Sequence, residues 1–324
     1  MIKVINAVLA VIGGVGGVLI LFYLFNALIE RLPARWEERA KPLVFVGPAV
    51  AAIGLFLIYP AVRTIILSFA NRDSTAWVGL DNYTNLLGSP DFRETLVNNV
   101  LWLAIVPASA VVLGLLVAVL ADKLSPSGEK FSKSVIFLPM AISFVGASTI
   151  WRFVYEWRPE GEEQIGLLNA LLTGVGFAPV AWLQAETANV NDVMLMVIMI
   201  WLQVGFAMVL LSAAIKTVPD DTLEAARLDG ANEVQIFFRV VVPQIWGTVL
   251  TVFVTISIGV MKIFDIIYVM TGGNFGTNVL GNEFFNQLFA FGDNGAAAAV
   301  VVILLIAALP IVVYQVRQVQ KQEA

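Results

Sequence analysis

Several polar residues lie in strongly apolar stretches of the sequence, where each polar group needs a partner. The candidates for a solute path among them are Gln203, Thr255, Lys262, Asp265 and Tyr268, and Thr251 and Ser257 lie on the same predicted span. Polar side chains inside apolar helices are costly, and by default they are candidates for function. They could line a path for a polar solute through hydrogen bonds, or they could bond within and between helices without touching a solute. Lys262 and Asp265 are three residues apart and could pair on one helix, which would neutralise both charges.

Residues that make or break covalent bonds are scarce. The chain contains no histidine and no cysteine, which excludes disulfides, thiol chemistry and the usual zinc sites. No nucleophile and base can be paired without them, and no Gly-rich segment ends in Lys-Ser or Lys-Thr to cradle the phosphates of ATP. The net charge of −5 argues against a nucleic-acid partner, because phosphate binding needs concentrated Lys and Arg. We expect no catalytic residue, metal or cofactor on this chain.

A second polar group forms a stretch between two apolar segments, at residues 219–243. Its central residues are Glu224, Ala225, Ala226, Arg227, Leu228, Asp229 and Gly230. Pro219 should end the preceding helix, because proline cannot continue helical hydrogen bonding. Asp220, Asp221 and Thr222 offer capping oxygens, and Asp221 with Glu224 has the spacing of a capping box. The sequence therefore predicts a short helix that begins near Asp221.

The rest of this stretch predicts an elbow and a second short helix. Gly230 can adopt the left-handed conformation that ends a helix, and Asn232 can cap a helix from Glu233 to about Arg239. Pro243 then leads back into apolar sequence. Ala225 and Ala226 would give the loop a flat surface that a partner protein could approach. The alternative is an amphipathic helix that only anchors the loop among lipid headgroups.

The elements that must position these residues are membrane helices. The chain has 324 residues, of which 59% are hydrophobic and 13% charged, and its mean hydropathy is +0.86. Its apolar residues fall in blocks long enough to cross about 30 Å of hydrocarbon as helices. We predict an all-α polytopic membrane protein with about seven spans, at residues 4–28, 43–69, 96–121, 134–156, 191–215, 244–270 and 295–316. The polar segments at 71–95 and 157–190 are long enough to form short surface helices.

The basic residues predict the orientation. Arg and Lys are enriched in the loops after the first, third and fifth predicted spans and in the C-terminal tail, as at Arg31, Arg35, Arg39, Lys133 and Lys321. Cytoplasmic loops carry such an excess. The N-terminus is therefore predicted to lie outside and the C-terminus in the cytoplasm. The loop at Glu224 would then be cytoplasmic.

The spacing of the Glu224 loop resembles the signature of the permeases of ABC importers. That signature reads Glu-Ala-Ala, three residues, Gly, nine residues, then an aliphatic, any residue, an aliphatic and Pro. It is met here by Glu224, Ala225, Ala226, Gly230, Val240, Val242 and Pro243. The two valines replace the commoner Ile and Leu. The resemblance implies that the loop is a coupling helix, which inserts into a groove of a cytoplasmic ATPase.

Other segments are similar to the carbohydrate-uptake branch of these permeases. The run at 79–83, Gly-Leu-Asp-Asn-Tyr, is similar to an external element of that branch, and the run at 264–273 is similar to the end of its penultimate span. That branch usually continues with Gly-Pro, whereas this chain has Asn274-Phe275-Gly276-Thr277. This departure, together with an added first span, resembles permeases for α-glucosides and related glycosides. The resemblance covers residues 43–318.

The resemblance implies a division of the chain and a set of partners. Residues 1–42 would be an extra N-terminal helix with its linker, 43–318 a six-helix permease core, and 319–324 a short cytoplasmic tail. The partners would be a second homologous permease, two copies of an ABC ATPase that hold ATP and Mg, and an extracytoplasmic binding protein. The chain would lie in a bacterial inner membrane and import an oligosaccharide or glycoside by alternating access, without being an enzyme itself.

Two other functions remain open from the sequence. An ion-coupled secondary transporter or channel would need an ion site, for which Lys262 with Asp265 is the candidate. A permease of the same fold could also carry a solute other than a sugar. The element at 79–83 argues against that alternative.

Overall fold

The regular secondary structure of the described residues is helical. The computed structural model describes residues 2–30, 33–159, 161–186 and 189–323, and its regular elements in these ranges are all helical. Of the basic residues used to predict orientation, Arg31 and the side chains of Arg35, Arg39 and Lys321 lie outside the described part. The chain separates into two compact units, Met1–Ile66 and Leu67–Ala324. This boundary is one of packing, and the predicted division at residue 42 stays a prediction.

The first unit contains two long helical stretches. Its elements are α1 (Ile2–Ile29), α2 (Ala34–Ile53), η1 (Gly54–Ile58), a π-helical turn, and α3 (Tyr59–Leu67), which ends one residue beyond the unit. α1 contacts α2, where the rings of Phe22 and Phe45 stack with their centroids 5.6 Å apart. Nearly every described side chain in this unit is exposed. These helices are therefore apolar segments whose surfaces need lipid or another protein to cover them.

The second unit is a bundle with short helices at both ends. Its elements are α4 (Asp81–Gly88), α5 (Pro90–Asp122), α6 (Pro126–Phe137), η2 (Leu138–Ala141), α7 (Phe144–Val154), α8 (Leu167–Gly174), α9 (Val190–Ile215), α10 (Asp220–Leu228), α11 (Glu233–Ile236), η4 (Phe237–Val241), α12 (Val242–Gln244), α13 (Trp246–Met261), α14 (Asp265–Met270), α15 (Leu280–Phe285), η5 (Asn286–Ala290) and α16 (Asn294–Glu323).

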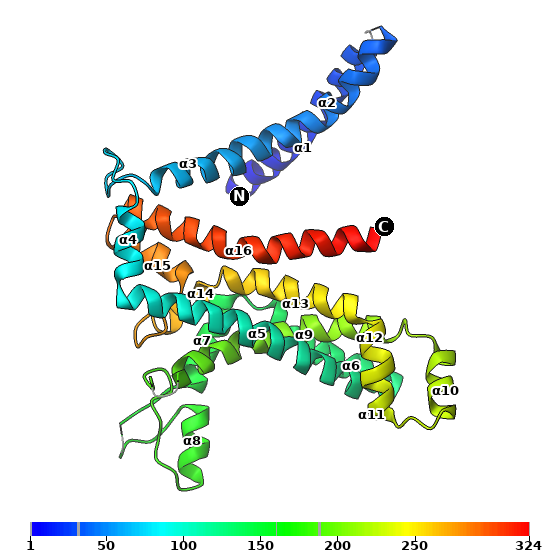
Figure 1. Cartoon of the computed structure of the whole chain (residues 1–324), viewed down its shortest axis with the longest axis vertical. Helices are drawn as coiled ribbons and strands as arrows, with labels where there is room; N and C mark the ends of the chain where they lie inside the picture. Colours follow the sequence, from blue (N-terminus) through cyan, green and yellow to red (C-terminus); the bar gives the residue numbers. More distant parts are fainter. Residues whose placement is uncertain (1, 31–32, 160, 187–188, 324) are drawn as a thin grey trace. The chain divides into compact units, whose positions relative to one another are not determined.

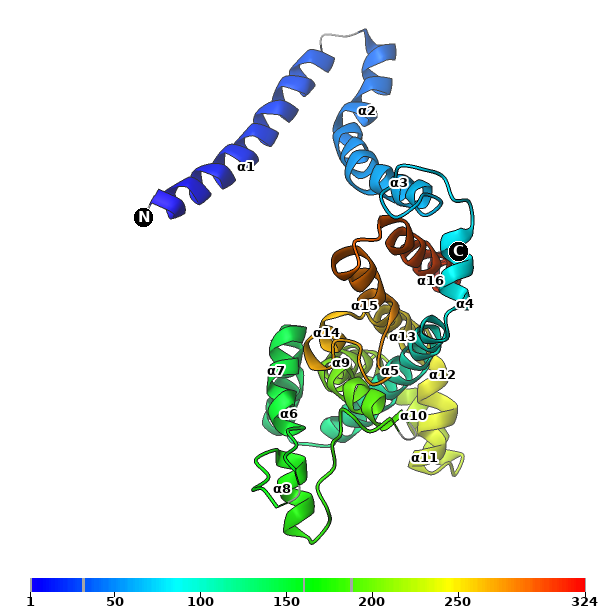
Figure 2. The same ribbon diagram turned by 90° about the vertical axis from the view of Figure 1, so that its left-hand side faces the viewer.

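The centre of the bundle is formed by α5, α9 and α13, which lie side by side (Figures 1 and 2). Trp102, Met199 and Ile256 from these three helices are completely or almost completely buried. At Gly114 on α5, an added Cβ would lie 2.6 Å from the Cβ of Ala207 on α9. Helices in lipid associate through such close packing, because lipid is as apolar as their side chains. A small residue therefore sets the spacing of the central pair.

Two of the predicted spans are bent pairs of helices. Helices at Ile5–Ala27, Lys41–Leu67, Pro90–Asp122, Val190–Ile215 and Asn294–Arg317 are long and apolar enough to span a membrane, and two bent pairs would bring the total to seven. In the predicted span 134–156, α6 and η2 meet α7 at 104°. Pro139 lies in η2, and the hydroxyl of Ser143 caps α7 by accepting a hydrogen bond from the Gly146 N–H. These two devices end one helix and start the next.

The predicted continuous span 244–270 is wrong in detail. The helical segment Glu233–Gln244 meets Trp246–Met261 at 71°, and helix stops again between Met261 and Asp265. A Cβ at Gly281 would lie only 2.5 Å from the Ile263 carbonyl oxygen. The second break is therefore packed closely by a glycine from a different part of the chain, a contact that local sequence does not encode.

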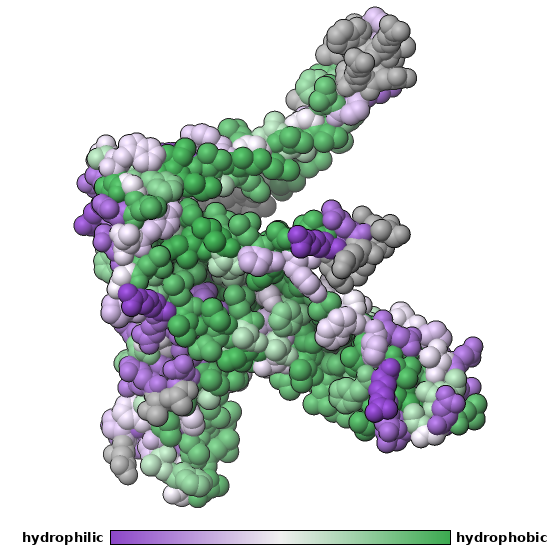
Figure 3. Space-filling model, in the orientation of Figure 1, coloured by the Kyte–Doolittle hydropathy of each residue, from purple (hydrophilic) through white to green (hydrophobic). Residues whose placement is uncertain are grey.

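Polar residues gather at the two ends of the second unit. α10, α11 and the C-terminus of α16 lie at one end, and α4, α8 and α15 lie toward the other (Figure 1). Hydrophobic residues cover the helices between them, and hydrophilic ones flank this zone (Figure 3). We call the two ends the α10 end and the α4 end. The predicted surface helices within 71–95 and 157–190 are confirmed as α4 and α8. Which side of the membrane each end faces stays a prediction.

Candidate functional site

The Glu224 loop begins with α10, which starts directly after Pro219. Pro219 occupies the N-cap position, and no side chain caps the helix. The predicted capping box of Asp221 and Glu224 is therefore wrong, because Asp221 already lies within the first turn. Asp220 and Asp221 instead place negative charge at the helix N-terminus, which the helix dipole favours.

α10 turns one face inward and the other to solvent. Leu223 and Ala226 are half-buried and pack against the core. Glu224 and Ala225 are exposed, and the Leu228 side chain is 89% exposed. The expectation that Ala225 and Ala226 share one flat docking surface is wrong, since a step of one residue turns a helix by about 100°. The exposed surface of α10 carries Glu224, Ala225 and Leu228.

The elbow between α10 and α11 is fixed by three local devices. Gly230 has φ of +83°, in the left-handed region, as predicted. Asn232 caps α11 as predicted, and it forms a capping box with Gln235. Arg227 Nε donates to Glu233 Oε1 at 2.9 Å across the turn. This hydrogen bond raises the pKa of the Arg227 guanidinium above its usual value, so that group stays charged.

The second part of the loop is longer than predicted. Helix continues from Glu233 through η4 and α12 to Gln244, beyond the predicted end near Arg239. Pro243 lies near the end of this helical stretch, just after the π-helical turn η4, and its missing N–H cannot continue the helical hydrogen bonding. The chain bends immediately afterwards, at Ile245. The loop is thus a helix, an elbow and a second helix, all at the α10 end, with Asp229 exposed at its tip.

The polar residues of the sixth predicted span do not act as a pair. Lys262 is the C-cap of α13, and Asp265 is the first residue of α14. Among the described side chains, no hydrogen bond or ion pair joins Lys262 to Asp265. The predicted neutralising pair is wrong, because the helix break removes the i,i+3 geometry. Whether either residue takes part in ion coupling stays a prediction.

Tyr268 belongs to a row of aromatic rings that joins α14 to α15 and η5. Its ring stacks on Phe264 with centroids 5.1 Å apart and meets the edge of Phe285 at 4.9 Å. Phe285 contacts Phe289 at 4.8 Å. Tyr268 and Phe289 are 48% and 66% exposed. The row therefore exposes aromatic rings. Of its residues, only Tyr268 was predicted from the sequence as a candidate for the solute path.

Gln203 and Thr255 are placed on other helices. Gln203 is half-buried on α9, and Thr255 is exposed on α13. The Thr255 hydroxyl donates to the Thr251 carbonyl at 2.8 Å, as expected of a threonine bonded within its own helix. Its oxygen can still accept a second hydrogen bond. Their contact with solute stays a prediction.

A cavity of about 600 Å³ lies at the α4 end. It lies between α4, the start of α5, the segment at 273–287 and the start of α16. Four carboxylates line it without any Lys or Arg in the lining, namely Asp91, Glu94, Glu283 and Asp293, and the side-chain amides Asn82, Asn85, Asn278, Asn286 and Gln287 accompany them. The lining of this opening is therefore polar and acidic.

Comparison with known proteins assigns the family. Residues 110–322 match the family described as "Binding-protein-dependent transport system inner membrane component". The chain belongs to this family. It is a multi-pass membrane permease of a binding-protein-dependent importer, and the match includes the whole Glu224 loop.

The permease is similar to proteins over nearly its full length. It is 42% identical over 299 residues to the α-glucoside transport system permease protein AglF of Rhizobium meliloti (strain 1021), covering 92% of this chain and 88% of that protein. It is 48% identical over 280 residues to the osmoprotective compounds uptake permease protein GgtC of Synechocystis sp., covering 86% and 99%.

A solved structure shares the fold. A chain of a bacterial ABC transporter involved in the import of the acidic polysaccharide alginate superposes with a TM-score of 0.75 at 19% sequence identity. The likeness covers 89% of the permease and 99% of that chain. It confirms the predicted all-α permease fold.

Two features of the permease were missed by sequence reasoning. Leu228 was named only as a residue of the predicted short helix and not as an exposed apolar side chain, although it lies off the Leu223–Ala226 stripe on a helical projection. The charged residues that meet near the root of α10 could not be found either. They come from three helices, and Glu129 and Lys216 are 87 residues apart in sequence.

Proposed function

We propose that the permease is the membrane subunit of an ATP-driven ABC importer and that α10 docks on a cytoplasmic ATPase. The observation that supports this most directly is the exposure of Leu228, which is 89% exposed while Leu223 and Ala226 on the same short helix pack against the core. Such a side chain on an exposed helix has the character of an interface anchor, because a few centrally buried side chains contribute most of the binding energy of protein interfaces.

The proposal includes the partners that such an importer needs. A second, homologous permease would cover the apolar surfaces that this chain leaves exposed, and two copies of an ABC ATPase would hold ATP and Mg. An extracytoplasmic binding protein would deliver solute at the α4 end. The α10 end would face the cytoplasm of a bacterial cell, and the chain would lie in its inner membrane. Closure of the ATPases would move α10 and switch the helices between two access states.

We infer that the cargo is a glycoside or oligosaccharide. The relative named for α-glucosides supports this at 42% identity. The aromatic row supports it as well, because ligand sites combine aromatic faces with a few polar groups. Tyr268 and Asp265 on α14 would line this path, with Gln203, Thr255 and Lys262 as further candidates. The relative named for the uptake of osmoprotective compounds supports a second cargo class, that of osmoprotectants.

The docking proposal is tested by Leu228→Asp in the complete complex. The complex would be purified through a tag on this chain and placed in proteoliposomes with its binding protein. A charge in the apolar pocket costs several kcal/mol unless it finds a partner, so we expect the variant to lose ATPase from the complex and to lose uptake. Val175→Asp is the matched control, because Val175 is 71% exposed in the loop after α8. Normal uptake and normal ATPase retention in Leu228→Asp would remove the proposal.

The energy source and the cargo are tested in the same vesicles. Uptake should stop when ATP is left out and should survive an ionophore that collapses ion gradients. A secondary transporter would show the reverse. Radiolabelled maltose, trehalose and sucrose probe the α-glucoside class, and glycine betaine probes a charged osmoprotectant. Competition by betaine without competition by any α-glucoside would overturn the proposed cargo.

A further inference from the structure

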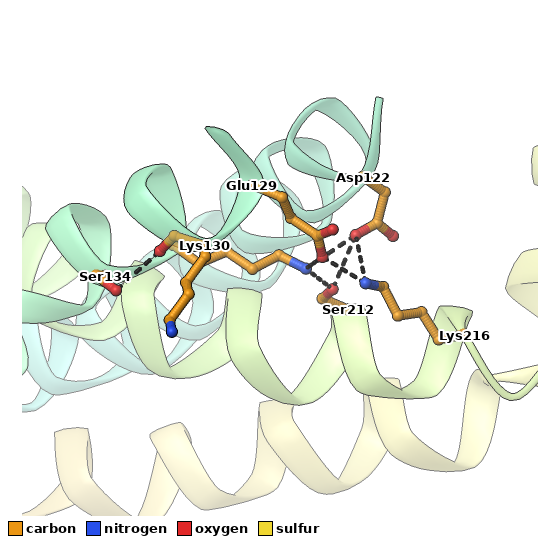
Figure 4. Close-up of polar contacts among 7 residues, drawn as sticks. Asp122, Glu129, Lys130, Ser134, Ser212 and Lys216 are labelled. Atoms are coloured by element: carbon orange, nitrogen blue, oxygen red, sulfur yellow. Dashed lines mark hydrogen bonds and ion pairs between the residues drawn. The ribbon is translucent and has the colours of Figure 1, made fainter. Parts of the chain in front are cut away.

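Four charged side chains and one hydroxyl meet where α5, α6 and α9 end (Figure 4). Lys133 Nζ on α6 lies 2.8 Å from Asp122 Oδ1, at the end of α5, and 2.5 Å from Glu129 Oε1. It also donates to the Ser212 hydroxyl on α9. The Ser212 hydroxyl in turn donates to Asp122 at 3.1 Å. We call Asp122, Glu129, Lys133, Ser212 and Lys216 the Lys133 cluster.

Lys216 completes the Lys133 cluster from the end of α9. It donates to Glu129 and lies 3.8 Å from Asp122. The cluster thus contains two cations and two anions, and each carboxylate faces both cations. The side chains of Lys133, Asp122 and Glu129 are only 19–21% exposed. Partly buried charges are screened less than exposed ones, and removal of one member would leave the others without full compensation.

The cluster lies at the root of the docking loop. Lys216 is the C-cap of α9, and Pro219, three residues later, occupies the N-cap position of α10. The connection is a tight turn, because the N–H groups of Thr217 and Val218 donate to the carbonyls of Ala214 and Ile215. Val218 is buried. A displacement of α10 therefore reaches Lys216 without a flexible linker.

The other side of the cluster leads to the helices of the solute path. α6 continues through η2 into α7, and α7 packs against α14, which carries Asp265 and Tyr268. The ion pairs tie α9 to the α5–α6 turn at one point. Coupling between distant parts of a protein needs such a continuous physical connection, and it must be shown by a coupling measurement.

We propose that the Lys133 cluster is a positioning device for transport, which holds the α5–α6 turn to the root of α10 so that both move together. The proposal rests on the proposed docking of α10 on an ATPase. Lys133 acts through its neighbours and does not touch solute. Without it, α10 would still dock and ATP would still be hydrolysed, but less of the motion would reach α6 and α7.

The test is the ratio of solute imported to ATP hydrolysed, measured in proteoliposomes with the complete importer and the α-glucoside from the panel above that the unmodified protein transports best. Lys133→Gln should keep ATP hydrolysis and lower this ratio roughly threefold to thirtyfold, which is the range of coupling that networks modulate. Lys133→Arg should restore it, because the charge and donors are kept. A purely structural role would change complex yield and thermal unfolding but not this ratio.

Lys130→Gln is the matched control. Lys130 is on the same helix, is exposed, and points away from the cluster (Figure 4). An equal transport ratio in Lys133→Gln and Lys130→Gln would overturn the proposal. If Lys133→Gln fails to assemble, Ser212→Ala decides, since it removes one hydroxyl without leaving a bare charge. A lowered ratio supports the cluster and an unchanged ratio overturns it.

The pattern of results separates this proposal from the docking of α10. Normal uptake in Leu228→Asp would remove the docking proposal, and the cluster would lose its basis. Loss of uptake in Leu228→Asp together with an unchanged ratio in Lys133→Gln would remove only the cluster. The charge-swapped pair Asp122→Lys with Lys133→Asp should recover part of what each single change loses, as a double-mutant cycle would show.

Discussion

Charge is treated in opposite ways at the two ends of the helical core. At the α10 end, cations pair with carboxylates, in the Lys133 cluster and in the Arg227–Glu233 pair. At the α4 end, the arginines donate to backbone carbonyls instead. Arg72 bonds Gly292, Arg93 bonds Leu87 and Arg152 bonds Val269. Among the described residues of the second unit, every ion pair lies at the α10 end.

This difference suggests how each end works. Paired charges fix one helix to another, which suits an end that must carry a force. Carboxylates without a cation, such as Asp91 and Glu94 in the α4-end cavity, stay ready for groups supplied from outside. At the α10 end the charged groups find their partners within the chain, whereas at the α4 end the carboxylates would be paired by groups of a bound partner. Four substitutions test this difference between the two ends.

The largest effect is expected at the elbow of the α10 end. Gly230→Val places a β-branched residue at φ of +83°, which L residues with a branched Cβ avoid. The elbow must change shape, and docking should fail, so that uptake falls by about tenfold or more while membrane insertion persists. Uptake and ATPase co-purification measure this. Gly174→Val at the end of α8 is the control, because that glycine has open space and no positive φ. Normal uptake in the Gly230 variant would contradict the role of the elbow.

A charge reversal in the α4-end cavity should have the next largest effect. Glu94→Lys introduces a cation where the lining has none. If the carboxylates of this lining receive cationic groups of the binding protein, the new cation would repel them, so we expect stimulation of ATP hydrolysis by the binding protein to fall about tenfold. ATP hydrolysis without the binding protein should not change. Glu162→Lys, an exposed change away from the cavity, is the control. An unaltered stimulation would end the idea that these carboxylates receive a partner.

A change between the two ends should have a smaller effect. Tyr268→Ala removes one ring from the aromatic row. Aromatic contacts contribute about 0.5–1.5 kcal/mol, so the KM for transported α-glucoside should rise roughly twofold to tenfold while ATPase retention stays normal. Tyr268→Phe keeps the ring and separates stacking from hydrogen bonding. If neither variant alters KM, the row does not line the solute path.

The smallest effect distinguishes the two kinds of pairing at the α10 end. Arg227 and Glu233 are 50% and 71% exposed, and exposed pairs contribute about 0.2–1 kcal/mol. Arg227→Gln should lower uptake about twofold at low salt, and half-molar salt should bring the unmodified protein down to the same level. The more buried Lys133 cluster should be less sensitive. If the difference in uptake between Lys133→Gln and the unmodified protein also disappears in half-molar salt, the Lys133 cluster is as sensitive to salt as the exposed pair, and this prediction is wrong.

The sequence predicts what depends on local chemistry. The helical spans follow from long apolar runs, and the elbow follows from Gly230 and Asn232, whose conformations are set by neighbouring residues. The start of α10 was placed one residue late, because a helix beginning after proline needs no side-chain cap. Ala226 was expected on the exposed surface of this helix, but it packs against the core.

The sequence does not predict what depends on distant contacts. The break before Asp265 lies where Gly281 closely approaches the Ile263 carbonyl, and no local sequence pattern predicts it. The Lys133 cluster joins residues from three helices, with Ser212 and Lys133 separated by 79 positions. Each of its charged residues reads alone as an ordinary basic or acidic residue at the end of a span.

The contact at Gly114 limits where this protein can change shape. α5 and α9 approach so closely there that a single methyl group does not fit. Such tight packing favours movement of the two helices as one unit. Bending is left to the joints at Ile245 and Ser143 and to the gap before Asp265. Substitutions on α14 and α15 should accordingly change cargo preference without disturbing the packing of α5 against α9. A bulkier residue at position 114 should lower the transport of every cargo alike.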